Sequence, residues 1–127
     1  MRQSHQLIIN GELQRFAKGV VAEGRFLFIS GVAERGATMG DQAENCLVAI
    51  KERVESLGGR LENIVQRMTF VTDIGQWQTD GATRQRAWLQ KHCPSLIESP
   101  PAGTLIGCVA LADPEFKVEI QVVVVLD

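Results

Sequence analysis

The sequence predicts an α+β domain in which two helices cover one face of a mixed, mostly antiparallel β-sheet. Three observations lead to this fold class. Apolar residues recur at helical spacing between positions 43 and 57, a second helical stretch ends before a proline, and short apolar runs alternate with turn residues. With 127 residues the chain is long enough to bury its own core, so we expect residues 1–127 to form a single domain.

Three strands are expected before the first helix. The first covers about residues 6–10 and ends at Asn10–Gly11, a pair typical of turns. The next two cover residues 20–23 and 25–30, and because only Gly24 separates them we expect a hairpin. The segment RFLFIS is apolar on both faces in its middle, which predicts a strand at the centre of its sheet.

The two helices have recognisable ends. Thr38 or Asp41 can cap the start of the first helix, and Gly58–Gly59 ends it. The second helix covers about residues 77–92 and ends before Pro94. The side chains expected to face the core are Ala43, Leu47, Ile50, Val54 and Leu57 in the first helix, and Gly81 or Ala82, Gln85, Trp88 and Leu89 in the second.

A strand over residues 64–74 separates the helices, and strands over residues 104–111 and 116–126 complete the sheet. In the last strand, alternate residues from Phe116 to Val124 are all apolar, so this face should meet the helices. The opposite face mixes polar residues with valines. Such a face is typical of a subunit interface, and we therefore expect a homo-oligomer.

Composition and charge exclude several classes of function. A formal net charge of −2 gives no electrostatic attraction for nucleic acid or for an anionic membrane. No apolar run approaches the roughly 20 residues that span a bilayer, and the N-terminal residues do not form a signal peptide. We therefore expect a cytoplasmic protein whose three cysteines are reduced and packed in the core. The spacing of histidines and cysteines predicts no metal site, and the common nucleotide-binding motifs are missing, so no cofactor is expected.

Two features near strand ends could carry chemistry. Glu119 is a lone carboxylate among β-branched residues. It is either an ordinary surface residue on the open face or an acid in an interface cleft that can hold or move a proton. Ser30 and Gly31 follow an apolar strand, where they form either an ordinary strand end or a site whose backbone N–H groups receive a ligand carbonyl or carboxylate.

A third feature is the loop around Phe16, which lies between Arg15 and Lys18. Two cations beside an aromatic ring could bind an anionic planar ligand, although an exposed basic loop explains the same residues equally well. None of these three features is specific on its own.

Taken together and in this order, these residues resemble the RidA family, also called YjgF, of enamine and imine deaminases. The similarity extends over nearly the whole chain. It is carried by RFAKGV, FLFISG, NCLVAIKERVESLGG and NIVQRMTFVTDIGQW, and by PAG followed by VEIQVVV. The resemblance implies a chorismate-mutase-like subunit, assembly as a homotrimer, and a small-molecule substrate bound in clefts between neighbouring subunits.

The resemblance also implies which residues form the site. Glu119 corresponds to the glutamate that positions the water attacking the imine carbon, and Ser30 and Gly31 correspond to the serine and glycine of the pocket. Phe16 stands where many members have a tyrosine, so that hydroxyl is missing.

The arginine that binds the substrate carboxylate in deaminating members is missing as well. Its position falls on Gly103 if the turn over residues 112–117 carries one extra residue, and on Thr104 if it does not. Thr104 can donate one hydrogen bond but cannot neutralise a carboxylate. Arg15, Lys18 and Arg84 are candidate substitutes, each of which is otherwise an ordinary solvated charge.

These residues support three hypotheses. The first is a RidA-like deaminase or hydrolase that detoxifies a small reactive enamine or imine metabolite other than the usual 2-iminoacids. The second is a non-catalytic trimer that binds or senses a small ligand, and the third is a structural or chaperone-like protein. Retention of Glu119 with Ser30 and Gly31 favours the first, whereas loss of the arginine and of the hydroxyl at Phe16 favours the second.

Overall fold

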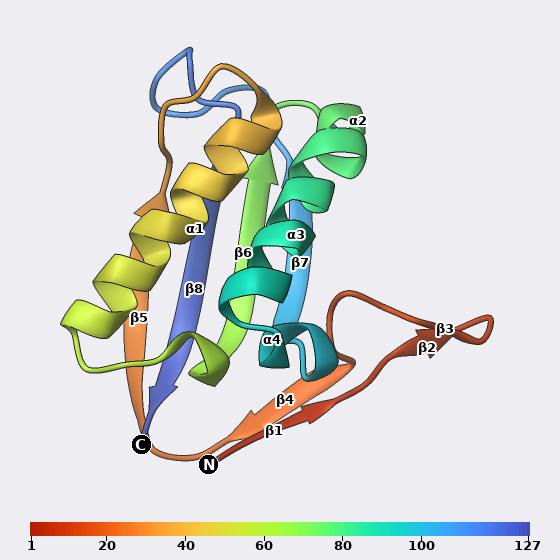
Figure 1. The fold of residues 1–127 in the computed structure, drawn as a ribbon, viewed down its shortest axis with the longest axis vertical. Helices are drawn as coiled ribbons and strands as arrows, with labels where there is room; N and C mark the ends of the chain where they lie inside the picture. The colour runs from red at the N-terminus through yellow and green to blue at the C-terminus, as the bar shows by residue number, and fades with distance from the viewer.

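The computed structural model describes residues 1–127 and contains a four-stranded sheet with its helices on one face (Figure 1). The strand order is β5-β8-β6-β7, with antiparallel pairs β5–β8 and β8–β6 and a parallel pair β6–β7. The predicted α+β class and the mixed, mostly antiparallel sheet are confirmed. The strands are β5 (Arg25–Val32), β6 (Ile64–Val71), β7 (Ala102–Gly107) and β8 (Val118–Leu126).

Two long helices, α1 (Met39–Ser56) and α3 (Ala82–His92), lie in front of the sheet in Figure 1. The predicted second helix over residues 77–92 is confirmed as helical, but its first five residues, Trp77–Gly81, form a π-helical turn, η2. The short segments α2 (Ile74–Gln76), α4 (Ser95–Glu98) and the 3₁₀ turn η1 (Leu61–Asn63) complete the helical layer. No helix combines the length and the apolarity that crossing a membrane would require.

The ends of α1 follow from local chemistry. Of the two predicted caps, Thr38 is the one used: its Oγ1 accepts a hydrogen bond from the Asp41 amide at 3.1 Å. At the other end Gly58 adopts φ +86°, and the Gly59 amide donates to the Val54 carbonyl at 2.9 Å, as in a Schellman motif. Leu57 was expected in the core, but it lies beyond the last helical residue and is exposed.

The core lies between the helices and the sheet. It includes Gln85, Trp88 and Leu89 of α3 as predicted, and Cys46, whose thiol donates to the Val32 carbonyl at 3.3 Å. Burial raises the pKa of Cys46 to about 12. Burying each large aliphatic side chain contributes about 1.5–3 kcal/mol. The predicted inner face of the last strand is confirmed, since four of its residues are at most 1% exposed: Val118, Ile120, Val122 and Val124.

The N-terminal residues form two small ladders outside this sheet. β1 (Arg2–His5) pairs with β4 (Gly19–Ala22), and β2 (Ile8–Ile9) pairs with β3 (Glu12–Leu13) in an arm that projects to the right in Figure 1. The predicted turn at Asn10–Gly11 is confirmed, because both residues have positive φ. The single strand expected over residues 6–10 is wrong, since the chain forms β1 and β2 instead.

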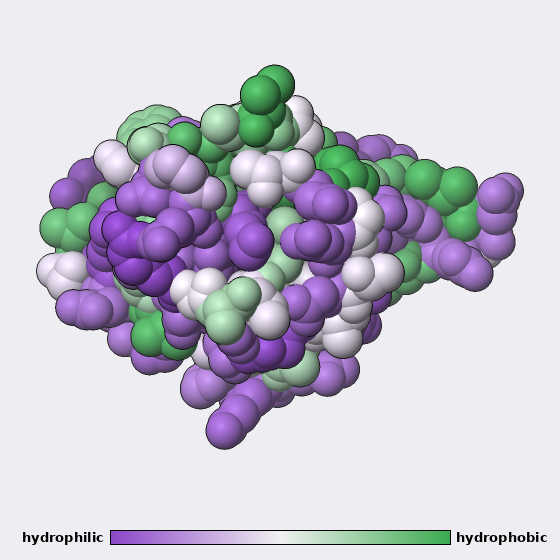
Figure 2. Space-filling view, turned by 90° about the horizontal axis from the view of Figure 1, so that it is seen from above, coloured by the Kyte–Doolittle hydropathy of each residue, from purple (hydrophilic) through white to green (hydrophobic).

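The arm carries exposed apolar side chains. Figure 2 shows a mostly hydrophilic loop end of the molecule, with hydrophobic groups along one edge and on the projecting arm. On the arm these are Ile8, Ile9 and Leu13, all about half exposed or more.

Two expectations about the strand beginning at Arg25 are wrong. β4 and β5 do not form a hairpin, because β4 pairs with β1 and β5 pairs with β8. Gly24, with φ +140°, turns the chain from one sheet to the other, and a Cβ there would lie 2.9 Å from the Leu126 carbonyl oxygen. β5 is also an edge strand rather than a central one. Its outer apolar face remains uncovered within one chain, and Phe28 is 74% exposed.

Candidate functional site

Ser30 and Gly31 lie in a β-bulge of β5. Ile29 pairs with Val122 and Val32 pairs with Ile120, so two residues of β5 oppose a single residue of β8. A bulge leaves backbone groups outside the ladder and redirects the side chains next to it. This irregularity lies at the loop end of the sheet and brings Gly31 against Glu119.

Glu119 lies on the face of β8 that points away from the helices, because its neighbours Val118 and Ile120 point into the core. It is partly buried and pairs with Phe70 of β6. A Cβ at Gly31 would overlap the Glu119 carboxylate and would lie 2.9 Å from its Cδ. Only glycine at position 31 therefore leaves the carboxylate where it is.

A buried amide holds the loops on either side of this region. Gln42 of α1 is 1% exposed, and its Oε1 accepts a hydrogen bond from the Lys117 amide at 2.8 Å. Its Nε2 donates to the carbonyls of Glu115 at 2.9 Å and Gly36 at 3.1 Å. The loop after β5 and the loop before β8 are thus tied to the same side chain.

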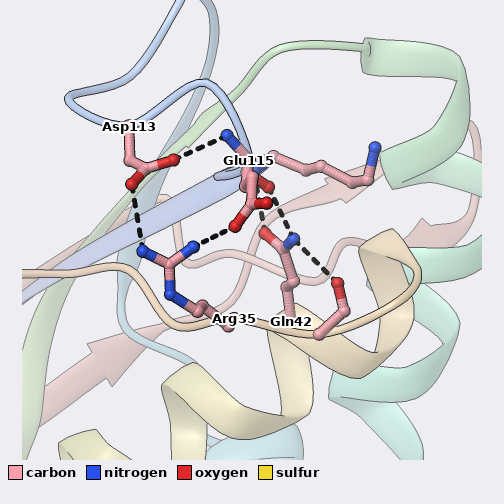
Figure 3. A network of polar contacts seen from close by, with 6 residues as sticks. Arg35, Gln42, Asp113 and Glu115 are labelled. Carbon is pink, nitrogen blue, oxygen red and sulfur yellow. Dashed lines mark hydrogen bonds and ion pairs between the residues drawn. The ribbon is translucent and has the colours of Figure 1, made fainter.

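Arg35 joins the same two loops at the surface (Figure 3). Its guanidinium pairs with Asp113 at 3.0 Å and with Glu115. The Glu115 amide and the Arg35 side chain lower the pKa of Asp113. Through Gln42 and Arg35, the segments that lead away from Gly31 and toward Glu119 are held in one arrangement.

Phe16 and Gly103 meet at a different place. The Ala17 amide donates to the Pro101 carbonyl at 2.9 Å, which fixes the loop beside the start of β7. A Cβ at Gly103 would lie 3.2 Å from the Cβ of Phe16. Gly103 is on the helix side of the sheet. Thr104, the next residue of the strand, alternates to the open face, and it also lines the pocket beside Gly103.

A pocket of about 670 Å³ lies beside Gly103, between the loop over residues 12–16, the helical segment formed by η2 and α3, and strands β6 and β7. Its apolar walls include Phe16 and Trp77. Its charged lining consists of Glu12, Arg15 and Arg67. Neither Glu119 nor the bulge lines this pocket.

Arg67 of β6 was not among the candidates from the sequence. It pairs with Gly103 across the β6–β7 ladder and lines the pocket, yet its side chain forms no hydrogen bond and no ion pair. Burial lowers the pKa of Arg67 to about 10, which still leaves the guanidinium charged at neutral pH. The signal in the sequence was a cation in the strand VQRMTFV, on the inward side shared with Thr69 and Val71.

Gln85 of α3 also lines the pocket and is 8% exposed. Its side-chain amide forms no hydrogen bond, and its Oε1 is enclosed without a donor. Leaving such a group unpaired costs about 1–3 kcal/mol. Arg67 and Gln85 are therefore two unpaired polar groups at one pocket.

The other candidate cations differ in availability. Arg84 is bound on two sides, by Asp41 at 3.0 Å and by Glu44 at 2.8 Å, and does not line the pocket. Arg15 is at the rim of the pocket, whereas Lys18 is exposed and outside it.

The predicted site residues thus fall into two groups on opposite faces of one sheet. Glu119 and the bulge are on the open face, and Phe16 with Gly103 is on the helix side. Because successive strand residues alternate between faces, the two groups within a single chain cannot contact the same small molecule. No three His, Cys, Asp or Glu side chains gather closely enough to hold a metal ion.

Comparison with known families shows to which family the chain belongs. The profile of the family described as Endoribonuclease L-PSP matches residues 11–126, which include Phe16, the bulge, Gly103 and Glu119. The chain belongs to the YjgF/Rid family. The resemblance seen in the sequence is confirmed at this level.

Solved structures of the family share the fold. YyfB from Yersinia pestis, a Rid family protein of unknown function, has a TM-score of 0.72 at 24% identity, covering 96% of this chain and 99% of that one. Rv2704 from Mycobacterium tuberculosis, a YjgF/YER057c/UK114 family member, has a TM-score of 0.70 at 19% identity, covering 99% and 100%. NMB1025 from Neisseria meningitidis, a YjgF family member, has a TM-score of 0.67 at 21% identity, covering 100% and 96%. A comparison with curated protein sequences gives no match.

Proposed function

We propose that this protein is a RidA-like hydrolase that deaminates a small reactive enamine or imine metabolite in the cytoplasm. The observation that carries this proposal is the close approach of Gly31 to the Glu119 carboxylate at the β-bulge. A partly buried acid held against an irregular strand provides a proton-handling group, and the bulge at Ser30 and Gly31 interrupts the ladder beside it.

The reaction needs only a water and a positioned acid–base group. Water adds to the carbon of the C=N bond while the Glu119 carboxylate accepts a proton from it. Glu119 returns this proton to the nitrogen, which gives a carbinolamine. The carboxylate then takes the hydroxyl proton and passes it to the nitrogen as the C–N bond breaks, so that the products are a carbonyl compound and ammonia. Ser30 and Gly31 hold the substrate close to that water, which lowers the entropic part of the barrier.

We propose that the working form is a homotrimer with the ligand between subunits. Two observations support assembly. The outer face of β5 exposes Phe28 and Phe26, a surface typical of an interface. The two groups of site residues lie on opposite faces of the sheet, so a second copy is needed to bring them to one ligand.

The substrate differs from the usual 2-iminoacids in this proposal. Neither Gly103 nor Thr104 supplies a guanidinium, and Phe16 supplies no hydroxyl. The same losses favour the second candidate function, a non-catalytic trimer that binds a small ligand. The two candidates differ in whether ammonia is released.

The test is ammonia release from imines generated in situ by oxidation of a panel of amino acids. We expect release by the wild-type protein and its loss in Glu119→Gln, with Glu52→Gln, an exposed carboxylate of α1, as the matched control. Wild-type protein that releases no ammonia above background on any imine, or that cleaves RNA instead, overturns the deaminase proposal. Ligand binding without release supports the non-catalytic trimer.

A further inference from the structure

Arg67 and Gln85 are the polar groups that the proposed reaction leaves unused. Arg67 lies beside Gly103 in the β6–β7 ladder, on the same face of the sheet. Gly103 places no side chain beside Arg67 on this face, and a Cβ there would lie 3.2 Å from the Phe16 Cβ and 3.6 Å from the Arg67 carbonyl oxygen. Arg67 on β6 therefore lies next to Gly103 on β7, one of the two positions at which the family resemblance led us to expect an arginine.

Neither group is satisfied by the protein itself. Arg67 has no carboxylate partner, whereas the arginines that are paired with acids, Arg35, Arg60 and Arg84, lie at the surface. In the same pocket the Oε1 of Gln85 is enclosed without a donor, whereas its Nε2 forms no hydrogen bond and is not enclosed. Arg67 is only partly buried and lines the pocket. Charges and amides away from bulk water are normally paired, so an unpaired guanidinium and an unpaired N–H donor at one pocket indicate a ligand that pairs with both.

The lining of the pocket restricts the ligand. A single guanidinium matches one carboxylate through two parallel hydrogen bonds. With two arginines against one glutamate the lining carries a small positive excess, which suits a monoanion better than a phosphate. The volume of about 670 Å³ is in the range of small-molecule pockets. The apolar walls are Leu13, Phe16, Trp77, Ala82 and Leu105.

We propose that this pocket binds a small monocarboxylate with an apolar body, whose carboxylate is held by Arg67 and whose adjacent polar group accepts a hydrogen bond from the Gln85 Nε2. Arg67 thereby supplies the carboxylate anchor that Gly103 lacks. The proposal rests on the proposed function only in assigning the pocket to substrate, since binding itself does not depend on turnover.

The test is direct binding to the intact protein, measured by titration calorimetry and by tryptophan fluorescence. Fluorescence is suitable because the chain has two tryptophans and no tyrosine, and Trp77 lines the pocket. The probes are benzoate, 3-phenylpropionate, the uncharged 3-phenylpropionamide, and inorganic phosphate. We expect the carboxylates to bind and the amide and phosphate to bind at least 10-fold more weakly, since a charge-assisted contact is worth about one to two powers of ten.

The variants are Arg67→Met, Arg67→Lys and Gln85→Met, with Arg53→Met on the exposed surface of α1 as the matched control. Arg67→Met should weaken carboxylate binding by about 10- to 100-fold and remove the preference over the amide probe. Arg67→Lys should fall between, because a lysine keeps the charge without the planar fork. Circular dichroism shows whether each variant is folded. If Arg67→Met does not fold, Gln85→Met and Arg67→Lys test the site instead.

Carboxylates that do not bind the wild type, or that bind Arg67→Met as tightly as the wild type, overturn the proposal. Phosphate binding more tightly than 3-phenylpropionate overturns the ligand class. The outcomes separate from those of the deaminase test. Carboxylate binding without ammonia release contradicts only the proposed function, and ammonia release with unaltered binding by Arg67→Met contradicts only the carboxylate site.

Discussion

The Glu119 region and the Arg67 pocket differ in whether their buried polar groups have hydrogen-bond or ion-pair partners. Around Glu119, the buried amide of Gln42 forms three hydrogen bonds and Arg35 is paired with two acids. In the pocket, the buried amide of Gln85 and the guanidinium of Arg67 have no partner. Satisfied polar groups fix a conformation, whereas unsatisfied ones reduce stability until a ligand pairs with them. The first region is therefore built for rigidity and the second for binding.

The sharpest test of this difference replaces the two buried glutamines by the same residue. Gln42→Met leaves the Lys117 amide and two carbonyls without partners, so we expect a loss of about 2–4 kcal/mol in the free energy of unfolding. Gln85→Met removes an amide that has no partner and should be neutral or stabilising by up to about 1 kcal/mol. Urea denaturation of both variants measures the contrast. Equal losses would show that the two amides play the same structural part.

A second pair of substitutions compares the available space. Gly31→Ala places a methyl group on the Glu119 carboxylate, so it should cost about 1–3 kcal/mol and reduce ammonia release at least 10-fold. In Gly103→Ala the new Cβ would lie 3.2 Å from the Phe16 Cβ and 3.6 Å from the Arg67 carbonyl oxygen, which are milder contacts, so stability should change by less than about 1 kcal/mol. Thermal denaturation and the ammonia assay together provide the readout. An active, fully stable Gly31→Ala protein would contradict the close packing at the bulge.

Arg67→Met tests the stability effect of the unpaired cation. Because a charged group is removed from a desolvated position without breaking any pair, we expect the ligand-free variant to gain roughly 1–2 kcal/mol. Denaturation without and with 3-phenylpropionate measures this, and the ligand should stabilise the wild type more than the variant. A destabilised variant would indicate that Arg67 packs as part of the structure.

The smallest effect is expected for Arg35→Ala, because its ion pairs are exposed to solvent. The loss in stability should shrink further in 1 M salt. Since the pKa of Asp113 is lowered in the folded state, its contribution is present above the ordinary carboxyl pKa of 3.8 and is lost as the pH falls below it. Denaturation of wild type and variant between pH 3 and pH 7 measures this. A difference that grows toward low pH would contradict the pairing.

Cys46 allows a separate test of the core, through the dependence of the free energy of unfolding on pH. Its folded-state pKa of about 12 lies above the ordinary 9.0, so the unfolded chain loses this proton first as the pH rises. The stability due to the neutral thiol is complete below about pH 9 and decreases between about pH 9 and 12. We expect Cys46→Ala to flatten this decrease, as followed by urea denaturation across that range. An unchanged alkaline slope would contradict the assignment.

The parts of the protein that depend on local periodicity could be predicted from the sequence. Spacing of 3.6 residues located α1 and α3 with their inward residues except Leu57, and alternation located the core face of β8. Glycines and Asn10–Gly11 marked the turns. The motif order also identified the family, and it selected Glu119, Ser30 and Gly31, which the fold brings to one end of the sheet.

The pairing of the strands, and the contacts between residues of different strands, could be seen only in the folded structure. β5 pairs with β8 rather than with β4, because Gly24 directs the chain into a second sheet. Arg67 and Gly103 are 36 positions apart and become neighbours only through the parallel β6–β7 ladder. Strand pairing is a long-range choice governed by the burial of whole faces, so no local pattern reveals it. For this reason the cation beside PPAGTL was found only after the fold had placed Arg67 of the neighbouring strand next to Gly103.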